Sequence, residues 1–189
     1  MVPWARGRLR SIAPVLRRLV ERLRARRPVG TVPWPSARPA PVPRGHRPDP
    51  GVAPPAGQHA HDYAGAVDVS YAPTPDGHPD PGEVVWTWVP YEEDPSVGKD
   101  RPVVVVGRAV QGQPGELAVL MLSSHEHPDD RRWMVLGAGA WDAEGRVSSV
   151  RVDRVLAVAP DAVRREGAAL DQARFDRVAA AVREAGRAG

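Results

Sequence analysis

The stretch that decides the fold is GEVVWTWVPYEEDPSVGKDRPVVVVGR, residues 82–108. Its first part, Glu83–Val89, is rich in β-branched and aromatic residues, and this composition predicts a strand. Pro90 and Pro95 then interrupt regular strand pairing, and four acidic side chains crowd the segment that ends at Asp100. The stretch therefore predicts two strands joined by a polar, acidic loop.

The second strand of this stretch opens with Arg101-Pro102 and continues into the run Val103–Val106. Because four consecutive valines leave no polar face, the run is typical of a strand at the centre of a sheet or barrel. Arg101 is thus expected at the start of a core strand, beside a polar loop. A fixed guanidinium charge in that place is suited to holding a phosphate.

Further strand-like segments lie on both sides of this stretch, and one helix is expected near the C-terminus. Asp171 is a fair N-cap for that helix, which Gly186 is expected to end, and Asp161–Gly167 predicts a short turn of helix. Short strands followed by one helix predict a mainly β fold, a small β-barrel with a C-terminal helix. The further predicted strands are Ala66–Tyr71, Glu116–Ser123, Arg132–Leu136 and one bent strand or a strand pair over Val147–Val158.

The sequence predicts three parts: a basic tail over residues 1–27, a Pro-rich linker over 28–62 and a folded domain over 63–186. Residues 12–27 place apolar side chains on one helical face with arginines around it. Such a basic helix can contact an anionic membrane or grip nucleic acid. The alternative is a helix that docks on its own domain, or a poorly ordered extension.

Charge is distributed unevenly along the chain of 189 residues. Residues 1–50 carry 12 arginines and 2 acidic residues, a balance of +10, whereas residues 51–189 have a balance of −7. The basic character therefore belongs to the tail, and the charge of the domain alone does not predict nucleic-acid binding. The chain has no cysteine, which excludes disulfides and thiol chemistry. The apolar runs near the N-terminus are too short for a membrane span or signal core, so a cytoplasmic location is expected.

Three segments resemble one family, the MazF/PemK-like toxins of bacterial toxin–antitoxin pairs. Gly82–Trp86 is similar to the family's opening strand, Gly98–Pro102 to its Gly-x-Arg-Pro motif, and Ser148–Arg154 to a later strand that leads into an aspartate turn. The resemblance covers about residues 66–185. It implies an SH3-like barrel, usually a homodimer, with RNA or DNA binding and a cognate antitoxin protein as partner. It also implies cleavage of single-stranded RNA, with no metal or other cofactor.

The resemblance also implies which residues act. The arginine of the Arg-Pro motif and the hydroxyl at the end of the third core strand fall on Arg101 and Ser123, which are then the catalytic residues. Ser124 replaces Ser123 if the strand register slips by one residue. The segment Pro90–Asp100 corresponds to a gating loop that lies over the RNA site and that the antitoxin also occupies. The residues expected to bind substrate are Lys99, Asp100, Ser124 and His125.

This chain departs from the family pattern at the central motif. Two residues, Lys99 and Asp100, separate glycine from arginine, and serine replaces the more common threonine at position 123. The carboxylate of Asp100 either weakens a phosphate site beside Arg101 or serves as a general base. The acidic balance of the domain also opposes the binding of a polyanion. The alternative function is therefore a non-catalytic barrel that binds a protein or nucleic acid through the same rim.

Plainer roles are open for several of these residues. Arg101 can simply neutralise the acidic loop at Glu92, Glu93 or Asp94. Loop histidines such as His125 and His127 are usually solvated, although both can also move protons or bind a metal. His59 and His61 form a second short cluster with metal-binding residue types. Trp86 and Trp88 alternate with their neighbours, which predicts core packing in preference to base stacking.

Overall fold

The computed structural model describes residues 51, 53–55 and 57–188. The predicted basic helix over 12–27 and most of the predicted linker over 28–62 lie outside the described residues. The described end of that linker already takes part in the fold, because Ala60 is fully buried and donates its N–H to the Trp88 carbonyl at 3.0 Å. The boundaries of the three predicted parts stay predictions.

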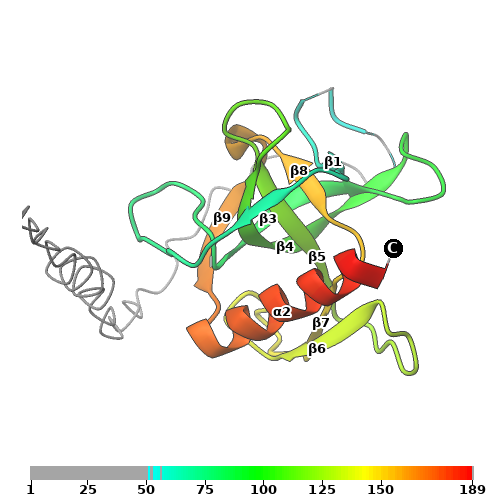
Figure 1. The fold of residues 1–189 in the computed structure, drawn as a ribbon, viewed down its shortest axis with the longest axis vertical. Helices are drawn as coiled ribbons and strands as arrows, with labels where there is room; N and C mark the ends of the chain where they lie inside the picture. Colours follow the sequence, from blue (N-terminus) through cyan, green and yellow to red (C-terminus); the bar gives the residue numbers. More distant parts are fainter. Residues whose placement is uncertain (1–50, 52, 56, 189) are drawn as a thin grey trace, which may run out of the picture. The chain divides into compact units, whose positions relative to one another are not determined.

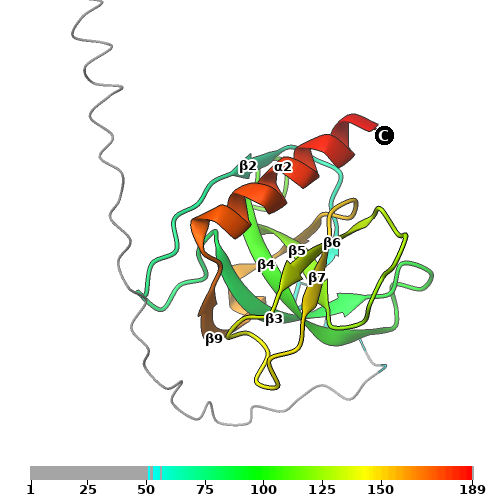
Figure 2. The same cartoon turned by 90° about the horizontal axis from the view of Figure 1, so that it is seen from below.

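The described residues form nine β-strands, one turn of 3₁₀ helix and one long helix (Figure 1). In Figure 2 the helix lies across one face of the curved sheet. The elements are β1 (His61–Asp62), β2 (Val67–Val69), β3 (Glu83–Pro90), β4 (Gly98–Ala109), β5 (Leu117–Ser123), β6 (Trp133–Gly137), β7 (Ser148–Arg151), β8 (Leu156–Val158), η1 (Pro160–Ala162), β9 (Arg164–Ala169) and α2 (Gln172–Ala188).

The strands pair in the order β1-β8-β5-β4-β3-β9, with β2 beside β4 and with β7 between β5 and β6. Every pairing is antiparallel. The mainly β fold with a C-terminal helix is confirmed, but the predicted barrel does not close. Within the described residues, β1 and β9 at the two ends of this path do not pair with each other. One edge of β5 pairs with β4. Its other edge pairs with β8 near the start of the strand and with β7 near the end, so no single strand continues the sheet on this side.

The core is built on both faces of β4, as its valine run predicts. Val104 and Val106 belong to a cluster that includes side chains of α2, whereas Val103 and Val105 belong to a second cluster with β8. All four valines, Val103–Val106, have an exposed fraction of 0%. Because β4 is fixed from both sides, it positions the residues that precede its valines with little freedom.

The C-terminal helix begins as the sequence predicts. The Asp171 carboxylate accepts a hydrogen bond from the Arg174 N–H at 2.8 Å, the contact of an N-cap residue. Phe175 and Val178 are buried against the sheet. The predicted end at Gly186 is wrong, since α2 runs to Ala188; a glycine costs a helix only about 1 kcal/mol. No helix among the described residues is long and apolar enough to span a membrane.

The segment before α2 differs from its prediction. The sequence predicts a short turn of helix over Asp161–Gly167, but the 3₁₀ turn ends at Ala162 and β9 follows. β9 pairs with β3, with Arg164 opposite Trp86. An available partner strand therefore overrides the weak local preference of this segment.

Candidate active site

The site lies where β4 begins and β5 ends. The two strands are antiparallel and pair Val103 with Met121 and Val104 with Leu120. Continuing the same register by two residues places Arg101 opposite Ser123. Residues directly opposite each other in such a pair have Cβ atoms about 5 Å apart. The strand register thus brings together the two residues for which the sequence predicts catalysis.

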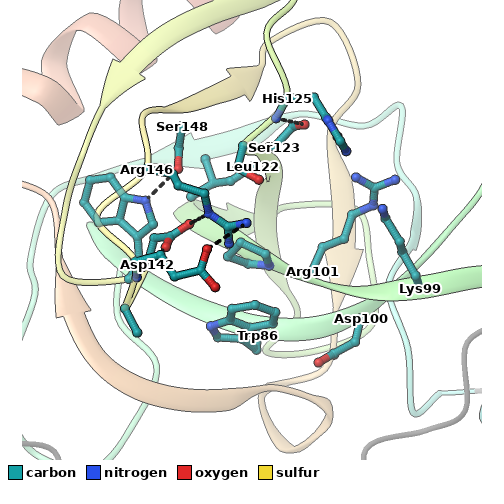
Figure 3. A pocket seen from close by; sticks show the side chains of 15 residues that line it. Trp86, Lys99, Asp100, Arg101, Leu122, Ser123, His125, Asp142, Arg146 and Ser148 are labelled. Atoms are coloured by element: carbon teal, nitrogen blue, oxygen red, sulfur yellow. Dashed lines mark hydrogen bonds and ion pairs between the residues drawn. The ribbon is translucent and has the colours of Figure 1, made fainter.

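A cavity of about 390 Å³ opens at this end of the strands. Figure 3 shows Lys99, Arg101, Ser123 and His125 together on one side of it, with Trp86 below. All six predicted site residues line this cavity: Lys99, Asp100, Arg101, Ser123, Ser124 and His125. The fold therefore gathers the residues that the sequence prediction names around one cavity.

Arg101 is half-buried, and its guanidinium makes no hydrogen bond or ion pair within the described part of the chain. Burial is the main cause that lowers the pKa of its guanidinium from the usual value, and the nearby Arg154 lowers it further. Arg101 does not neutralise the acidic loop, because Glu92 pairs with Arg151 and Asp94 accepts hydrogen bonds from Ser96. Arg101 thus keeps its donors available to an anion that enters the cavity.

Lys99 lies two residues before Arg101 and on the same face of β4, since side chains alternate along a strand. The positive charge of Arg101, followed by burial, lowers the pKa of the Lys99 ammonium. Lys99 also has no ion-pair partner among the described residues. An anion that binds between Lys99 and Arg101 reduces the repulsion between their two positive charges.

Ser123 is buried, with an exposed fraction of 6%, at the last position of β5. Its Oγ accepts a hydrogen bond from the backbone N–H of His125 at 3.2 Å. The hydroxyl hydrogen therefore remains free to be donated into the cavity. Ser124 and His125 follow on the chain and are exposed.

Asp100 does not act on Arg101. Its carboxylate forms an ion pair with Arg164 of β9, and Figure 3 shows the side chain directed away from Arg101. Its second oxygen, Oδ1, is buried and accepts no hydrogen bond in the described structure. The alternation of a β-strand explains this separation, because residues 100 and 101 face opposite sides of β4.

The opposite wall of the cavity comes from the segment between β6 and β7, which the sequence analysis did not single out. Arg146 there forms ion pairs with Asp142 at 2.9 Å and with Glu144 at 3.3 Å. The Trp141 indole donates to Ser148 Oγ at 3.0 Å and fixes this segment against β7. Only a tertiary contact carries these residues to the site, so local sequence patterns held no signal for them.

A second cavity of about 230 Å³ adjoins the first and shares Lys99, Arg101, Ser123 and His125 with it. His127 lines it and stacks on Trp133, with ring centroids 3.9 Å apart. Burial lowers the pKa of the His127 imidazole, so the neutral form is favoured. No group of three or more potential metal ligands occurs among the described residues, including those around His59, His61 and His127.

The two predicted tryptophans have different environments. Trp88 is 3% exposed and contacts the edge of the His59 ring at a centroid distance of 5.1 Å. Trp86 is only half-buried and lines the larger cavity. The prediction of core packing therefore describes Trp88, whereas Trp86 forms part of the site wall.

Fold and site together define a small antiparallel β-sheet protein with a cation-lined cavity at the ends of its central strands. The family model for the PemK-like, MazF-like toxins of type II toxin–antitoxin systems matches residues 80–185. This match spans more than half of the chain, and the chain belongs to that family, as its motifs predict. Membership implies an antitoxin protein as partner. Among curated proteins, none matches the chain.

Proposed function

We propose that this toxin-family protein is an endoribonuclease that cleaves single-stranded RNA without a metal ion. The observation that carries the proposal is the half-buried guanidinium of Arg101, which has no counter-ion in the described structure and lies across from the buried hydroxyl of Ser123. A desolvated, partnerless arginine in a cavity is suited to a phosphate, which offers two oxygens to its planar donor fork.

The reaction in this proposal uses the RNA itself as nucleophile. The ribose 2′-oxygen attacks the adjacent phosphorus, the bond from phosphorus to the 5′-oxygen breaks, and a 2′,3′-cyclic phosphate and a 5′-hydroxyl result. Negative charge grows on the non-bridging phosphate oxygens during this step. Arg101 stabilises that charge most strongly in the transition state, which is the condition for accelerating the reaction. Single-stranded RNA is required because paired A-form geometry resists the alignment of nucleophile and leaving group.

The neighbouring residues have supporting roles in this proposal. Ser123 donates its free hydroxyl hydrogen to a phosphate oxygen. His125 lines both cavities with Arg101 and Ser123. In this proposal its imidazole accepts or returns a proton. Lys99 adds positive charge that attracts the RNA backbone, and Ser124 contacts the bound strand. Asp100 acts indirectly, since its ion pair with Arg164 links the start of β4 to β9 across the intervening β3.

The partner assignments extend the same proposal. The antitoxin binds across the two cavities and the segment Pro90–Asp100, and in this way blocks access of RNA to Arg101. A homodimer and a cytoplasmic location are further predictions that come from the family resemblance. The contact of the tail with RNA or with an anionic membrane falls on residues outside the described structure.

The test is a cleavage assay on a long, unstructured RNA in excess chelator, with DNA of the same sequence as the matched control. The proposal predicts discrete cuts in the RNA, cyclic phosphate ends on the products and no cut in the DNA. Cleavage that requires an added metal, or that occurs equally in DNA, contradicts the mechanism. A folded protein that cuts no RNA at any salt concentration favours the alternative of a non-catalytic binding domain.

A further inference from the structure

The larger cavity, at the start of β4, is lined by the only lysine of the whole chain. The sequence has 26 lysines and arginines together, and all of them except Lys99 are arginines. A guanidinium stays protonated in proteins and is no nucleophile, whereas a lysine amine that loses its proton can attack a carbonyl carbon. The only side-chain amine of the protein therefore lies in the candidate active site.

The surroundings of Lys99 favour a reactive amine. Lys99 is half-buried at the second position of β4, and its ammonium makes no hydrogen bond or ion pair within the described residues. The two acidic side chains on the opposite wall, Asp142 and Glu144, pair with Arg146 instead. Because the positive charge of Arg101, followed by burial, lowers the pKa of the Lys99 ammonium, a larger fraction of this amine is neutral than on an open surface.

Arg101 gives this amine a neighbour that can bind an anion. The two residues lie two positions apart on the same face of β4, which separates their Cα atoms by about 7 Å. Figure 3 shows their side chains extending from β4 on the same side of the cavity. Arg101 has no counter-ion within the described residues, so its donor fork is available to a phosphate. A carbonyl group bonded directly to that phosphate then lies within reach of Lys99.

The cavity also has the room and the hydrogen-bond donor that such a molecule requires. Its volume is about 390 Å³, within the range of roughly 300–1,000 Å³ that small-molecule sites have. Ser123 lies across from Arg101, and its hydroxyl hydrogen is free to be donated to a phosphate or carbonyl oxygen. The cavity thus offers a cation, a hydroxyl donor and an amine to one small ligand.

We propose that Lys99 is an acylation site, and that it takes the acyl group from an acyl phosphate whose phosphate is held by Arg101. The neutral amine attacks the carbonyl carbon, a bond forms between nitrogen and carbon, and the bond from this carbon to the phosphate oxygen breaks. The phosphate leaves with the electron pair and takes one proton from the attacking nitrogen. The proton that the ammonium lost before the attack has passed to water. The products are an amide on Lys99 and inorganic phosphate.

Acylation changes the charge of the site. The amide nitrogen carries no positive charge, and the acyl group occupies space beside Arg101. The formation of the amide does not depend on the nuclease function, but its consequence rests on that proposed function. Acylated protein should bind RNA more weakly and cut it more slowly, so acyl phosphates restrain the protein through Lys99.

The first test compares two amines in one molecule. The variant Arg108→Lys introduces a second amine at an exposed position of the same strand, away from both cavities. The full chain of this variant is incubated with acetyl phosphate, and mass spectrometry of its peptides follows both sites. Acetylation at Lys99 is expected to be about tenfold faster, as for a ligand held by charged hydrogen bonds. Equal rates at the two positions overturn the proposal.

The second test asks whether Arg101 holds the phosphate. Arg101→Gln also removes the charge that lowers the Lys99 pKa, so a small acetyl thioester, which has no phosphate, serves as the matched donor. The ratio of the acetyl phosphate rate to the thioester rate is expected to fall about tenfold in Arg101→Gln and to stay constant in Arg108→Gln. An equal slowing of both donors overturns the role of Arg101 as the phosphate holder.

A measurement on the wild-type protein needs no variant at position 101. Inorganic phosphate should slow the acetylation of Lys99 by acetyl phosphate and leave the reaction with the thioester unchanged, because only the first donor competes for Arg101. Inorganic phosphate that has no effect on either donor contradicts the proposal.

The consequence for RNA is measured without cleavage. A fluorescent, fully 2′-O-methylated single-stranded RNA of eight nucleotides is titrated by anisotropy with the full chain before and after acetylation, because this RNA lacks the nucleophile. Acetylated protein is expected to bind it several-fold more weakly. Lys99→Arg, which keeps the charge but has no amine, is the control whose affinity the same treatment should leave unchanged. An equal loss of affinity in this control overturns the effect of Lys99 acylation on RNA.

The outcomes separate this inference from the proposed function. If Lys99 is acetylated selectively but the unmodified protein cuts no RNA, the acylation site stands and the nuclease assignment fails. If the protein cuts RNA but Lys99 reacts no faster than the amine introduced by Arg108→Lys, the nuclease assignment stands and the acylation site fails.

Discussion

The hairpin of β4 and β5 has two ends, and they differ in how their polar groups are satisfied. At the turn end, Arg108 donates to the Gly115 carbonyl at 3.0 Å, and Glu116 accepts a hydrogen bond from the Gln113 N–H at 2.8 Å. At the open end, Arg101 and Lys99 make no ion pair within the described residues. The polar side chains at the turn end are therefore hydrogen-bonded to one another's neighbours, whereas the cationic side chains at the open end have unused hydrogen-bond donors.

This difference indicates which end binds a ligand. The turn end is a local structure whose polar groups complete one another, and it needs no further partner. The open end keeps cations beside two cavities, although residues 51–189 as a whole carry a charge of −7. Local arrangement thus outweighs the total charge of the domain, and single substitutions at the two ends should have unequal effects.

The largest expected effect is that of Arg101→Ala. Removing the charge that stabilises the phosphate in the transition state should lower kcat/KM for RNA cleavage at least about 100-fold. Arg108→Ala is the matched control at the turn end, where it removes an exposed arginine of the same strand and should leave cleavage within about twofold. Steady-state rates on one RNA substrate measure both. A similar loss of kcat/KM in the two variants would show that the two ends of the hairpin do not differ in function.

Ser123→Ala should have the next largest effect. The loss of one hydroxyl donor at the phosphate is expected to lower kcat about tenfold or more, with little change in thermal stability. Ser124→Ala tests the register of β5, because Ser124 follows the last strand residue and is exposed. If the Ser124 variant loses more activity than the Ser123 variant, the serine assignment is wrong.

Lys99→Gln should have a smaller effect that appears mainly in binding. Lys99 attracts the backbone without a fixed geometry, so KM is expected to rise several-fold while kcat changes little. The plot of log affinity against log salt concentration should become shallower by about 0.7, the slope for one phosphate contact on a single strand. An unchanged salt dependence means that Lys99 makes no contact with RNA.

The smallest effect concerns pH and stability. Burial lowers the pKa of His127 in the folded protein, against the influence of Asp130 and with that of His125, Arg101 and Arg132. The unfolded chain then binds more protons below about pH 6.5, so stability falls as the pH drops through that range. His127→Gln should show a smaller fall of the melting temperature between pH 7.5 and 5.5. The hydrogen bond from Arg132 lowers the pKa of Asp130 to about 2, so Asp130 is protonated only in more acidic solution.

The sequence predicts the centre of the fold better than its edges. The valine run of β4 and the apolar run of β5 predict strands that are buried on both faces, and the register of the two strands places Arg101 and Ser123 opposite each other. β1, which has only two residues, and β9 both pair with strands that are distant in the sequence, so local patterns did not indicate them. The barrel prediction failed for the same reason, since closure depends on which edges meet.

The site was predicted in part. The motif around Arg101 identified the residues of β4 and β5, but Asp142 and Arg146 reach the cavity from a turn-rich segment with no distinctive pattern. Arg151, which lines the second cavity, stands in an alternating strand, where an arginine between Val150 and Val152 was the available signal. Ion pairs such as Arg151 with Glu92 join residues far apart in the chain, and only the fold shows them.

The most direct test of the central claim follows the arginine side chains themselves while RNA binds. Nitrogen-15 NMR of the Nε–H groups, assigned with Arg101→Lys and Arg108→Lys, is recorded during titration with the 2′-O-methylated RNA. We predict that the Arg101 signal shifts with saturation of the RNA site and that the Arg108 signal does not move. An Arg101 signal that stays unchanged while RNA is bound would contradict the assignment of the open end as the phosphate site.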